Sequence, residues 1–119
     1  MEIEWSNRYN HNEDDVQKYA PTSAGVYILL VKKKDSGKWR RYYVGQAKNL
    51  KQRLLDHLSD SEENECIKKK VTDKVVGFRT AIVSKQSDRD GIEKFLIDEI
   101  EPKCNDNDPG GQPIPVNLP

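Results

Sequence analysis

Two short segments rich in β-branched and aromatic residues, 25–34 and 39–45, are separated by the turn-forming sequence DSGK. Two such segments joined by a polar connection that contains glycine predict an antiparallel β-hairpin. This hairpin provides the first two strands of the predicted sheet, and segment 75–84 (VVGFRTAIVS) is predicted to be a third strand.

Helices are predicted before and after the third strand in the sequence. The leucines of segment 50–58 recur on one helical face, and Asn49 can cap this helix. A weaker helical pattern covers 62–71, and segment 14–20 can form one helical turn before Pro21.

The last helix has the clearest predicted boundaries. Asp90 followed three residues later by Glu93 has the form of a capping box, and Pro102 ends the helix. The element order is therefore β–β–α–(α)–β–α. The predicted fold class is α+β, a small three-stranded antiparallel sheet flanked by helices.

The length of 119 residues indicates one globular domain, predicted at 21–105, between a polar extension (1–20) and a Pro/Gly-rich extended tail (106–119). The longest apolar run, 25–31, is too short to span a membrane, and the polar N-terminus does not resemble a signal peptide. Cys66 and Cys104 lack CxxC spacing, which argues against a zinc cluster and is typical of a reducing compartment. We therefore expect a cytoplasmic location and no membrane partner.

The formal net charge is zero, but the charges are unevenly distributed. Segment 32–53 holds nine lysines or arginines and one acid, whereas 56–65 holds five acids and no lysine or arginine. A neutral total can conceal a basic face that a phosphate backbone could meet. Lysines at a hairpin tip can equally protect a sheet edge. The candidate DNA-binding residues are Lys32, Lys33, Lys48, Lys51 and Arg53.

Four side chains near the hairpin can form a chemical site. Tyr27 and Tyr43 share a face of the hairpin if paired residue numbers sum to an even value. Arg53 and His57 lie one turn apart on the following helix, beside its apolar face. Arginine binds phosphate bidentately, and phenols with an imidazole can position or deprotonate a water.

Each of these residues also has a simpler explanation. A tyrosine in a strand, or an arginine or histidine beside an apolar helix face, is more often structural than catalytic. Glu93 can stabilise a helix N-terminus without any further role. Gly45 ends the second strand, where it permits a sharp turn or the close approach of a ligand.

The order of these motifs resembles the GIY-YIG nuclease family. Its signature is similar to GVY at 25–27 and YVG at 43–45, followed by QAKNLKQRL with Arg53 at the arginine position of the family. His57 lies where many members carry His or Tyr. Glu93 and Asn105 match the metal-binding glutamate and the terminal asparagine. The resemblance, which covers about 21–105, extends to the catalytic domain of the excision-repair nuclease subunit.

The resemblance implies a metal-dependent endonuclease that hydrolyses DNA phosphodiester bonds. One Mg²⁺ or Mn²⁺ would bind at Glu93, largely through water. Tyr27 or Tyr43 would act as base or relay for the attacking water, and Arg53 would offset charge on the phosphate. His57 is a further catalytic candidate. The supporting residues implied are Gly25, Gly45, Gln46 and Asn105.

Three departures from the family pattern stand out: a longer interval between the two tyrosines, Gln46 where repair members often have Lys, and Cys104 in place of an aromatic residue. The alternative function is a non-catalytic nucleic-acid-binding or adaptor module that retains the fold. A third alternative is an interaction domain that docks a partner through the tail PIPVNLP. A protein partner or a homodimer would add DNA affinity to so small a basic face.

Overall fold

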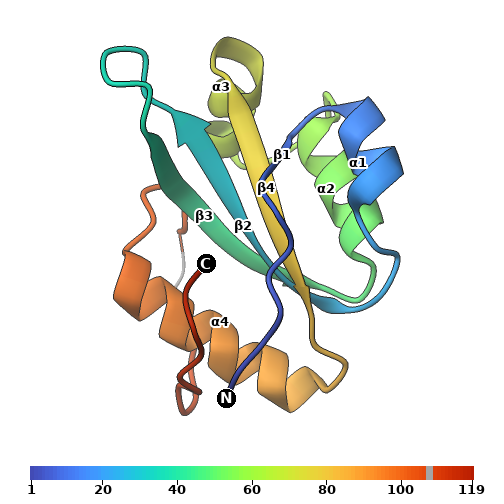
Figure 1. The fold of residues 1–119 in the computed structure, drawn as a ribbon, viewed down its shortest axis with the longest axis vertical. Coiled ribbons are helices and arrows are strands. Elements are labelled where there is room, and N and C mark those ends of the chain that lie inside the picture. The colour runs from blue at the N-terminus through green and yellow to red at the C-terminus, as the bar shows by residue number, and fades with distance from the viewer. Residues whose placement is uncertain (107–108) are drawn as a thin grey trace.

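A computed structural model describes residues 1–106 and 109–119. Its helices and strands follow the predicted order, and two short elements precede the hairpin (Figure 1). The elements are β1 (Tyr9–Asn10), α1 (Glu13–Tyr19), β2 (Gly25–Lys32), β3 (Trp39–Ala47), α2 (Leu50–Leu58), α3 (Glu65–Asp73), β4 (Val76–Ile82) and α4 (Gln86–Ile100).

The strands form one antiparallel sheet with the order β1-β4-β2-β3. The prediction of three strands is therefore wrong by one, because β1 adds a fourth at the sheet edge. This strand has only two residues, which is too short for the alternation that identifies a strand in a sequence. The hairpin register pairs Tyr27 with Gly45, so the two tyrosines share a face as predicted.

Helices cover both faces of the sheet (Figure 1). One core, on the face covered by α1, α2 and α3, contains Val16, Leu54 and Ile67 together with odd-numbered residues of β2. The other core, on the face covered by α4, contains Ile92 and Leu96 together with even-numbered residues of β2. Because β2 is central and buried on both faces, it appears in the sequence as a continuous apolar run.

The start of α4 differs from the prediction. The helix begins at Gln86 instead of Asp90, and Lys85 at its N-cap makes no side-chain hydrogen bond. The buried Arg89 side chain donates to the carbonyls of Val83 and Ser84, which ties the first turn to the preceding loop. Glu93 therefore lies in the second turn, where it does not cap the free backbone N–H groups of the helix start. The capping-box interpretation of Asp90 and Glu93 is wrong.

The two ends of the chain lie together beside α4 (Figure 1). Asn117 exchanges hydrogen bonds with the backbone of Ile3, and its carbonyl accepts one from the Trp5 indole. Ile114 packs against Gly91 of α4. Segment 109–119 contains no helix or strand, but it packs on the chain's own N-terminus and α4. The domain boundaries given above stay predictions.

Cys66 and Cys104 form a disulfide, which disagrees with the interpretation of these cysteines as two separate thiols typical of a reducing compartment. The bond joins α3 to the segment after α4 across 38 positions of sequence. No described helix is long and apolar enough to cross a membrane. The cytoplasmic location stays a prediction.

Candidate active site

The two phenols lie together against α2. Tyr27 and Tyr43 project from the same face of the hairpin, with ring centroids 6.2 Å apart. Gly45 lies opposite Tyr27, and a Cβ at this position would overlap the phenol ring. A Cβ at Gly25 would likewise overlap the Ala81 carbonyl of β4. Glycine at these two positions therefore lets the Tyr27 ring and the neighbouring strand approach closely.

The helix α2 adds a cation and an imidazole to the phenols. Asn49 accepts a hydrogen bond from the Gln52 N–H and sets the start of this helix, as predicted. Arg53 acts on both phenols through its charge and hydrogen bonding, which oppose the rise in the pKa of each phenol caused by burial. The Tyr27 hydroxyl lies 2.7 Å from His57 Nε2, and the Tyr43 and His57 rings contact edge to face. The predicted group Tyr27, Tyr43, Arg53 and His57 is therefore assembled.

Burial determines the protonation of this group. It raises the pKa of both phenols, and the positive charge of Arg53 partly opposes that shift. Burial also lowers the pKa of His57 to about 3, an effect that Arg53 and His11 reinforce. Near neutral pH the phenols and the imidazole are therefore all uncharged, and Arg53 carries the only charge among these four side chains.

Glu93 reaches the hairpin from α4 and is held by an amide. Gln46 at the end of β3 donates to Glu93 Oε1 at 3.1 Å and to Asp90 Oδ1 at 2.8 Å. Gln86 donates both to Gln46 and to Asp90. Burial raises the pKa of Glu93, and the Gln46 hydrogen bond opposes that shift. Glu93 also raises the pKa of both phenols, so all three groups share one electrostatic environment.

Asn105 holds the second strand from behind the site. Its side chain accepts from the Val44 N–H at 2.9 Å and donates to the Val44 carbonyl at 2.8 Å. Val44 is the middle residue of the YVG segment, between Tyr43 and Gly45. The amide therefore pairs with the free side of an edge strand and fixes the backbone that carries Tyr43.

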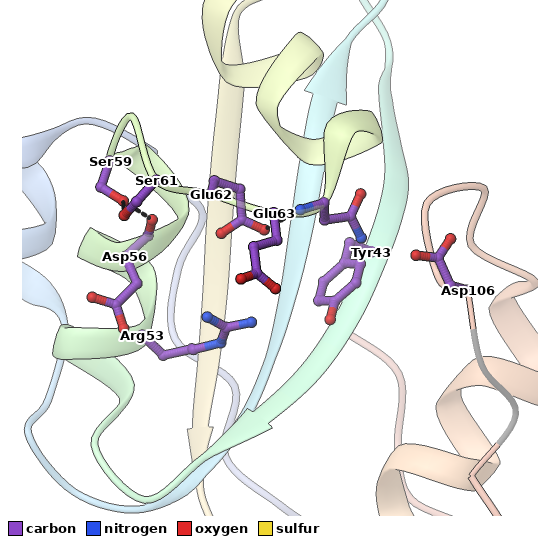
Figure 2. A pocket seen from close by; sticks show the side chains of 9 residues that line it. Tyr43, Arg53, Asp56, Ser59, Ser61, Glu62, Glu63 and Asp106 are labelled. Atoms are coloured by element: carbon purple, nitrogen blue, oxygen red, sulfur yellow. Dashed lines mark hydrogen bonds between the residues drawn. The ribbon is translucent and has the colours of Figure 1, made fainter.

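A pocket of about 560 Å³ opens beside these residues (Figure 2). Arg53 points from α2 across the pocket, and Tyr43 faces it from β3. Tyr27, with 1% of its surface exposed, lies behind this wall. The other lining residues are mostly acidic or polar: Asp56, Ser59, Ser61, Glu62, Glu63, Asn64 and Asp106.

The predicted DNA-binding lysines fall at two ends of the molecule. Lys32 and Lys33 lie at the hairpin tip, where they line a basic cleft with Lys34, Arg40, Lys70 and Lys74. Lys48 and Lys51 lie at the other end, near the start of α2, and the Lys51 ammonium donates to the Gln17 carbonyl. Nothing tests their contact with DNA, which stays a prediction.

A family model described as the UvrC-like GIY-YIG domain matches residues 23–106. The chain belongs to this family. The GVY and YVG segments lie on adjacent strands with their tyrosines on one face, and the α+β fold with an antiparallel sheet is that of GIY-YIG domains. The family resemblance and the fold class are confirmed.

Solved GIY-YIG domains share this fold. The N-terminal endonuclease domain of UvrC from Thermotoga maritima, bound to its catalytic divalent cation, magnesium, is 28% identical with a TM-score of 0.56. The alignment covers 78% of this chain and 98% of that domain. A point mutant of the same domain, bound to its catalytic divalent cation, is 26% identical with a TM-score of 0.58 over 78% and 98% of the two chains.

Curated relatives are much longer than this GIY-YIG chain. UvrABC system protein C from Chlamydia abortus is 35% identical over 97 residues, which cover 78% of this chain and 15% of that protein. The same protein from Syntrophotalea carbinolica is 30% identical over 93 residues, 78% of this chain and 14% of the relative. The chain thus spans about 15% of the length of the relatives it matches.

Three polar residues of the site were missed by sequence reasoning. Glu62 lies against His57, His11 packs edge-on against the same ring, and Asp90 shares the Gln46 amide with Glu93. His11 lies in a connecting segment without a periodic pattern. Glu62 was placed in the helix predicted at 62–71, but α3 begins at Glu65, and no spacing relates either residue to His57. Asp90 is predicted as a helix cap and as a neighbouring carboxylate, but the sequence pattern does not report that it shares the Gln46 amide.

Proposed function

We propose that this chain is a metal-dependent endonuclease that hydrolyses DNA phosphodiester bonds. The observation that supports this best is the meeting of the Tyr43 phenol and the Arg53 cation on one pocket wall, with the buried Tyr27 phenol behind it and a half-buried carboxylate in the same electrostatic environment. Neutral phenols can orient a water, and a guanidinium can bind the phosphate that the water attacks. The relatives named UvrC, and the endonuclease domain with bound magnesium, agree with this reaction class.

The donor set fits one hard cation. Mg²⁺ keeps most of its waters and is bound by one or two carboxylates. Glu93 provides one carboxylate, and Asp90, which shares the Gln46 amide with it, provides a neighbour. The described residues contain no group of three His, Cys, Asp or Glu that could enclose a metal ion. A bound Mg²⁺ or Mn²⁺ would offset negative charge on the phosphate.

The chain's own residues divide the remaining tasks. Tyr43 lines the pocket, so its oxygen is placed to accept a hydrogen bond from the attacking water. As a neutral phenol it can take the water's proton only as a relay, passing its own hydroxyl proton to solvent in the pocket. Arg53 binds the phosphate and offsets charge there as the 3′ oxygen leaves. Tyr27, buried behind the wall, holds Arg53 and His57. Asn105 and Gly45 fix the strand that carries Tyr43.

Removing each phenolic oxygen should separate the roles of the two tyrosines. Tyr43→Phe should slow cleavage by roughly a hundredfold with an unchanged melting temperature, since general-base loss costs about that much. Tyr27→Phe should slow cleavage and also lower stability by about 1–3 kcal/mol, because it leaves His57 Nε2 unpaired in the interior. Single-turnover cleavage of labelled DNA with Mg²⁺ and thermal unfolding measure the two effects.

Tyr42→Phe provides the matched control for this experiment. Tyr42 is adjacent and equally buried, and its hydroxyl has no hydrogen-bond partner among the described residues. This variant should cleave at the wild-type rate. If wild-type protein cleaves no duplex, flap, junction or single-stranded DNA with either metal, the nuclease proposal is wrong, and the non-catalytic binding module replaces it.

The basic cleft is the proposed contact for the DNA backbone away from the reacting phosphate. Of its eight lining residues, six are lysine or arginine and one, Asp35, is acidic. The cleft begins at Lys32, five residues along β2 from Tyr27, which corresponds to roughly 17 Å. That separation matches about five base pairs of duplex. The acidic side of the catalytic pocket would otherwise repel a polyanion.

A charge reversal in the cleft should change the salt dependence of DNA binding. Lys70→Glu should weaken binding and reduce the slope of log K against log salt by about one, the contribution of one phosphate contact. Lys18→Glu on α1, outside the cleft, is the matched control and should leave the slope unchanged. Fluorescence anisotropy in EDTA gives both slopes. Equal slopes in the two variants would show that the cleft does not bind DNA.

A further inference from the structure

Four side chains form a series that runs through the interior from one side of the pocket to another. In order, they are Arg53, Tyr27, His57 and Glu62. Arg53 acts on the Tyr27 phenol through its charge and hydrogen bonding, which oppose the rise in the pKa of Tyr27 caused by burial, and the Tyr27 hydroxyl lies 2.7 Å from His57 Nε2. On the far side of the imidazole, His57 Nδ1 lies 3.2 Å from Glu62 Oε2. Arg53 and Glu62 line the pocket (Figure 2). Tyr27 and His57 are almost fully buried.

The two outer side chains of this series, Arg53 and Glu62, determine the direction of every hydrogen bond within it. A guanidinium can only donate, and an ionised carboxylate can only accept. Toward Arg53 the Tyr27 oxygen can only accept, so its hydroxyl proton is free to be donated to His57 Nε2. A neutral imidazole has one protonated nitrogen, so the proton of His57 lies on Nδ1 and faces Glu62. The low pKa of His57, caused mainly by burial, keeps the ring neutral.

The position of Glu62 is itself well supported. Its backbone N–H donates to the Ser59 carbonyl, and its Oε1 accepts from the Asn64 N–H. The contact between Nδ1 and Oε2 is short, although its angle departs from that of a hydrogen bond. Within the described residues Nδ1 has no better-aligned acceptor. The other polar groups around the ring are Tyr27, Tyr43, Arg53 and His11, and none of them offers a carboxylate.

We propose that Glu62 is a positioning residue, which acts on Arg53 through His57 and Tyr27. By selecting the Nδ1–H tautomer of His57, Glu62 directs the Tyr27 hydroxyl toward Nε2 and leaves the phenolic oxygen free to accept from Arg53. Arg53 is thereby held at the pocket wall in the orientation that binds phosphate. This inference rests on the proposed nuclease function for its effect on rate, but the tautomer can be observed without any substrate.

Nitrogen-detected NMR of the His57 ring tests the tautomer directly. Wild-type protein should show a neutral ring protonated on Nδ1 at pH 7. Glu62→Ala should shift this ring toward the Nε2–H form. Glu62→Gln should keep the wild-type tautomer, because the amide oxygen can still accept from Nδ1–H. Asp60→Ala removes an exposed carboxylate from the same connection after α2, outside the pocket lining, and is the matched control, with no change expected.

Cleavage kinetics test the consequence for Arg53. Glu62→Ala should lower kcat on the order of 10- to 100-fold with a smaller change in KM, as expected for a misplaced transition-state contact. Glu62→Gln should recover most of the rate, and Asp60→Ala should keep all of it. A wild-type ring protonated on Nε2 would overturn the proposal, and so would an unchanged tautomer in Glu62→Ala.

The two proposals can fail separately. If wild-type protein does not cleave DNA but carries the Nδ1–H tautomer that Glu62→Ala loses, the nuclease function is wrong and the hydrogen-bond chain is correct. If Glu62→Ala does not fold, the wild-type spectrum and the Glu62→Gln variant still decide the tautomer. A cleaving enzyme with the opposite tautomer would refute the role of Glu62 alone.

Discussion

Glu93→Gln is expected to reduce Mg²⁺-dependent DNA cleavage by several orders of magnitude while leaving the fold intact. The neutral amide is a far poorer partner for a hard dication than a carboxylate. The substitution keeps the size of the side chain, and its amide oxygen can still accept from Gln46 Nε2. Glu93 lies in the second turn of α4, so no helix cap is lost. Cleavage of labelled DNA with and without Mg²⁺ measures the effect.

The same variant should be as stable as wild type in EDTA, or more stable. Burial raises the pKa of Glu93, so the folded protein holds this charge at a cost that a neutral amide avoids. Glu99→Gln, the same change at an exposed position of α4, is the matched control and should affect neither property. A Glu93→Gln protein that retains full activity would refute the assigned metal ligand, and Asp90 would be the next carboxylate to test.

Local sequence patterns predicted the parts of the fold that depend on neighbouring residues. The alternation of the hairpin and the parity of Tyr27 and Tyr43 placed both phenols on one face, and the observed pairing of Tyr27 with Gly45 agrees. The cap at Asn49 and the helical spacing brought Arg53 and His57 to those phenols. Strand register and helix periodicity are short-range properties, so a single sequence contains the information for them.

The missed features depend on contacts between distant parts of the chain. The start of α4 is set by the buried Arg89, whose hydrogen bonds to the preceding loop replace the capping box expected at Asp90. Glu62 meets His57 only because the connection after α2 folds back over the helix end. The disulfide likewise joins residues 38 positions apart. No periodicity or cap pattern reports such contacts.

Acidification should unfold the protein through its buried histidine. The pKa of His57 falls from its usual 6.5 to about 3 on folding, mainly because burial disfavours the imidazolium. The unfolded chain therefore binds a proton that the folded chain does not bind between these two values, so stability falls as the pH decreases. The contribution of His57 is fully present above pH 6.5 and is lost progressively toward pH 3. The loss between pH 7 and pH 5 should be about 2 kcal/mol.

Urea unfolding of wild type and His57→Tyr at pH 7 and pH 5 isolates this contribution. Tyrosine does not titrate in this range, so the stability of the variant should depend less on pH, by about 2 kcal/mol over the interval. The groups that face His57 from neighbouring elements are Tyr27, Tyr43, Arg53, His11 and Glu62. Burial lowers the pKa of His11, and all five groups are present in both proteins, so their effects largely cancel in the comparison. Equal pH dependence in the two proteins would mean that the His57 imidazole accepts its proton in the folded state, stabilised as imidazolium by Glu62.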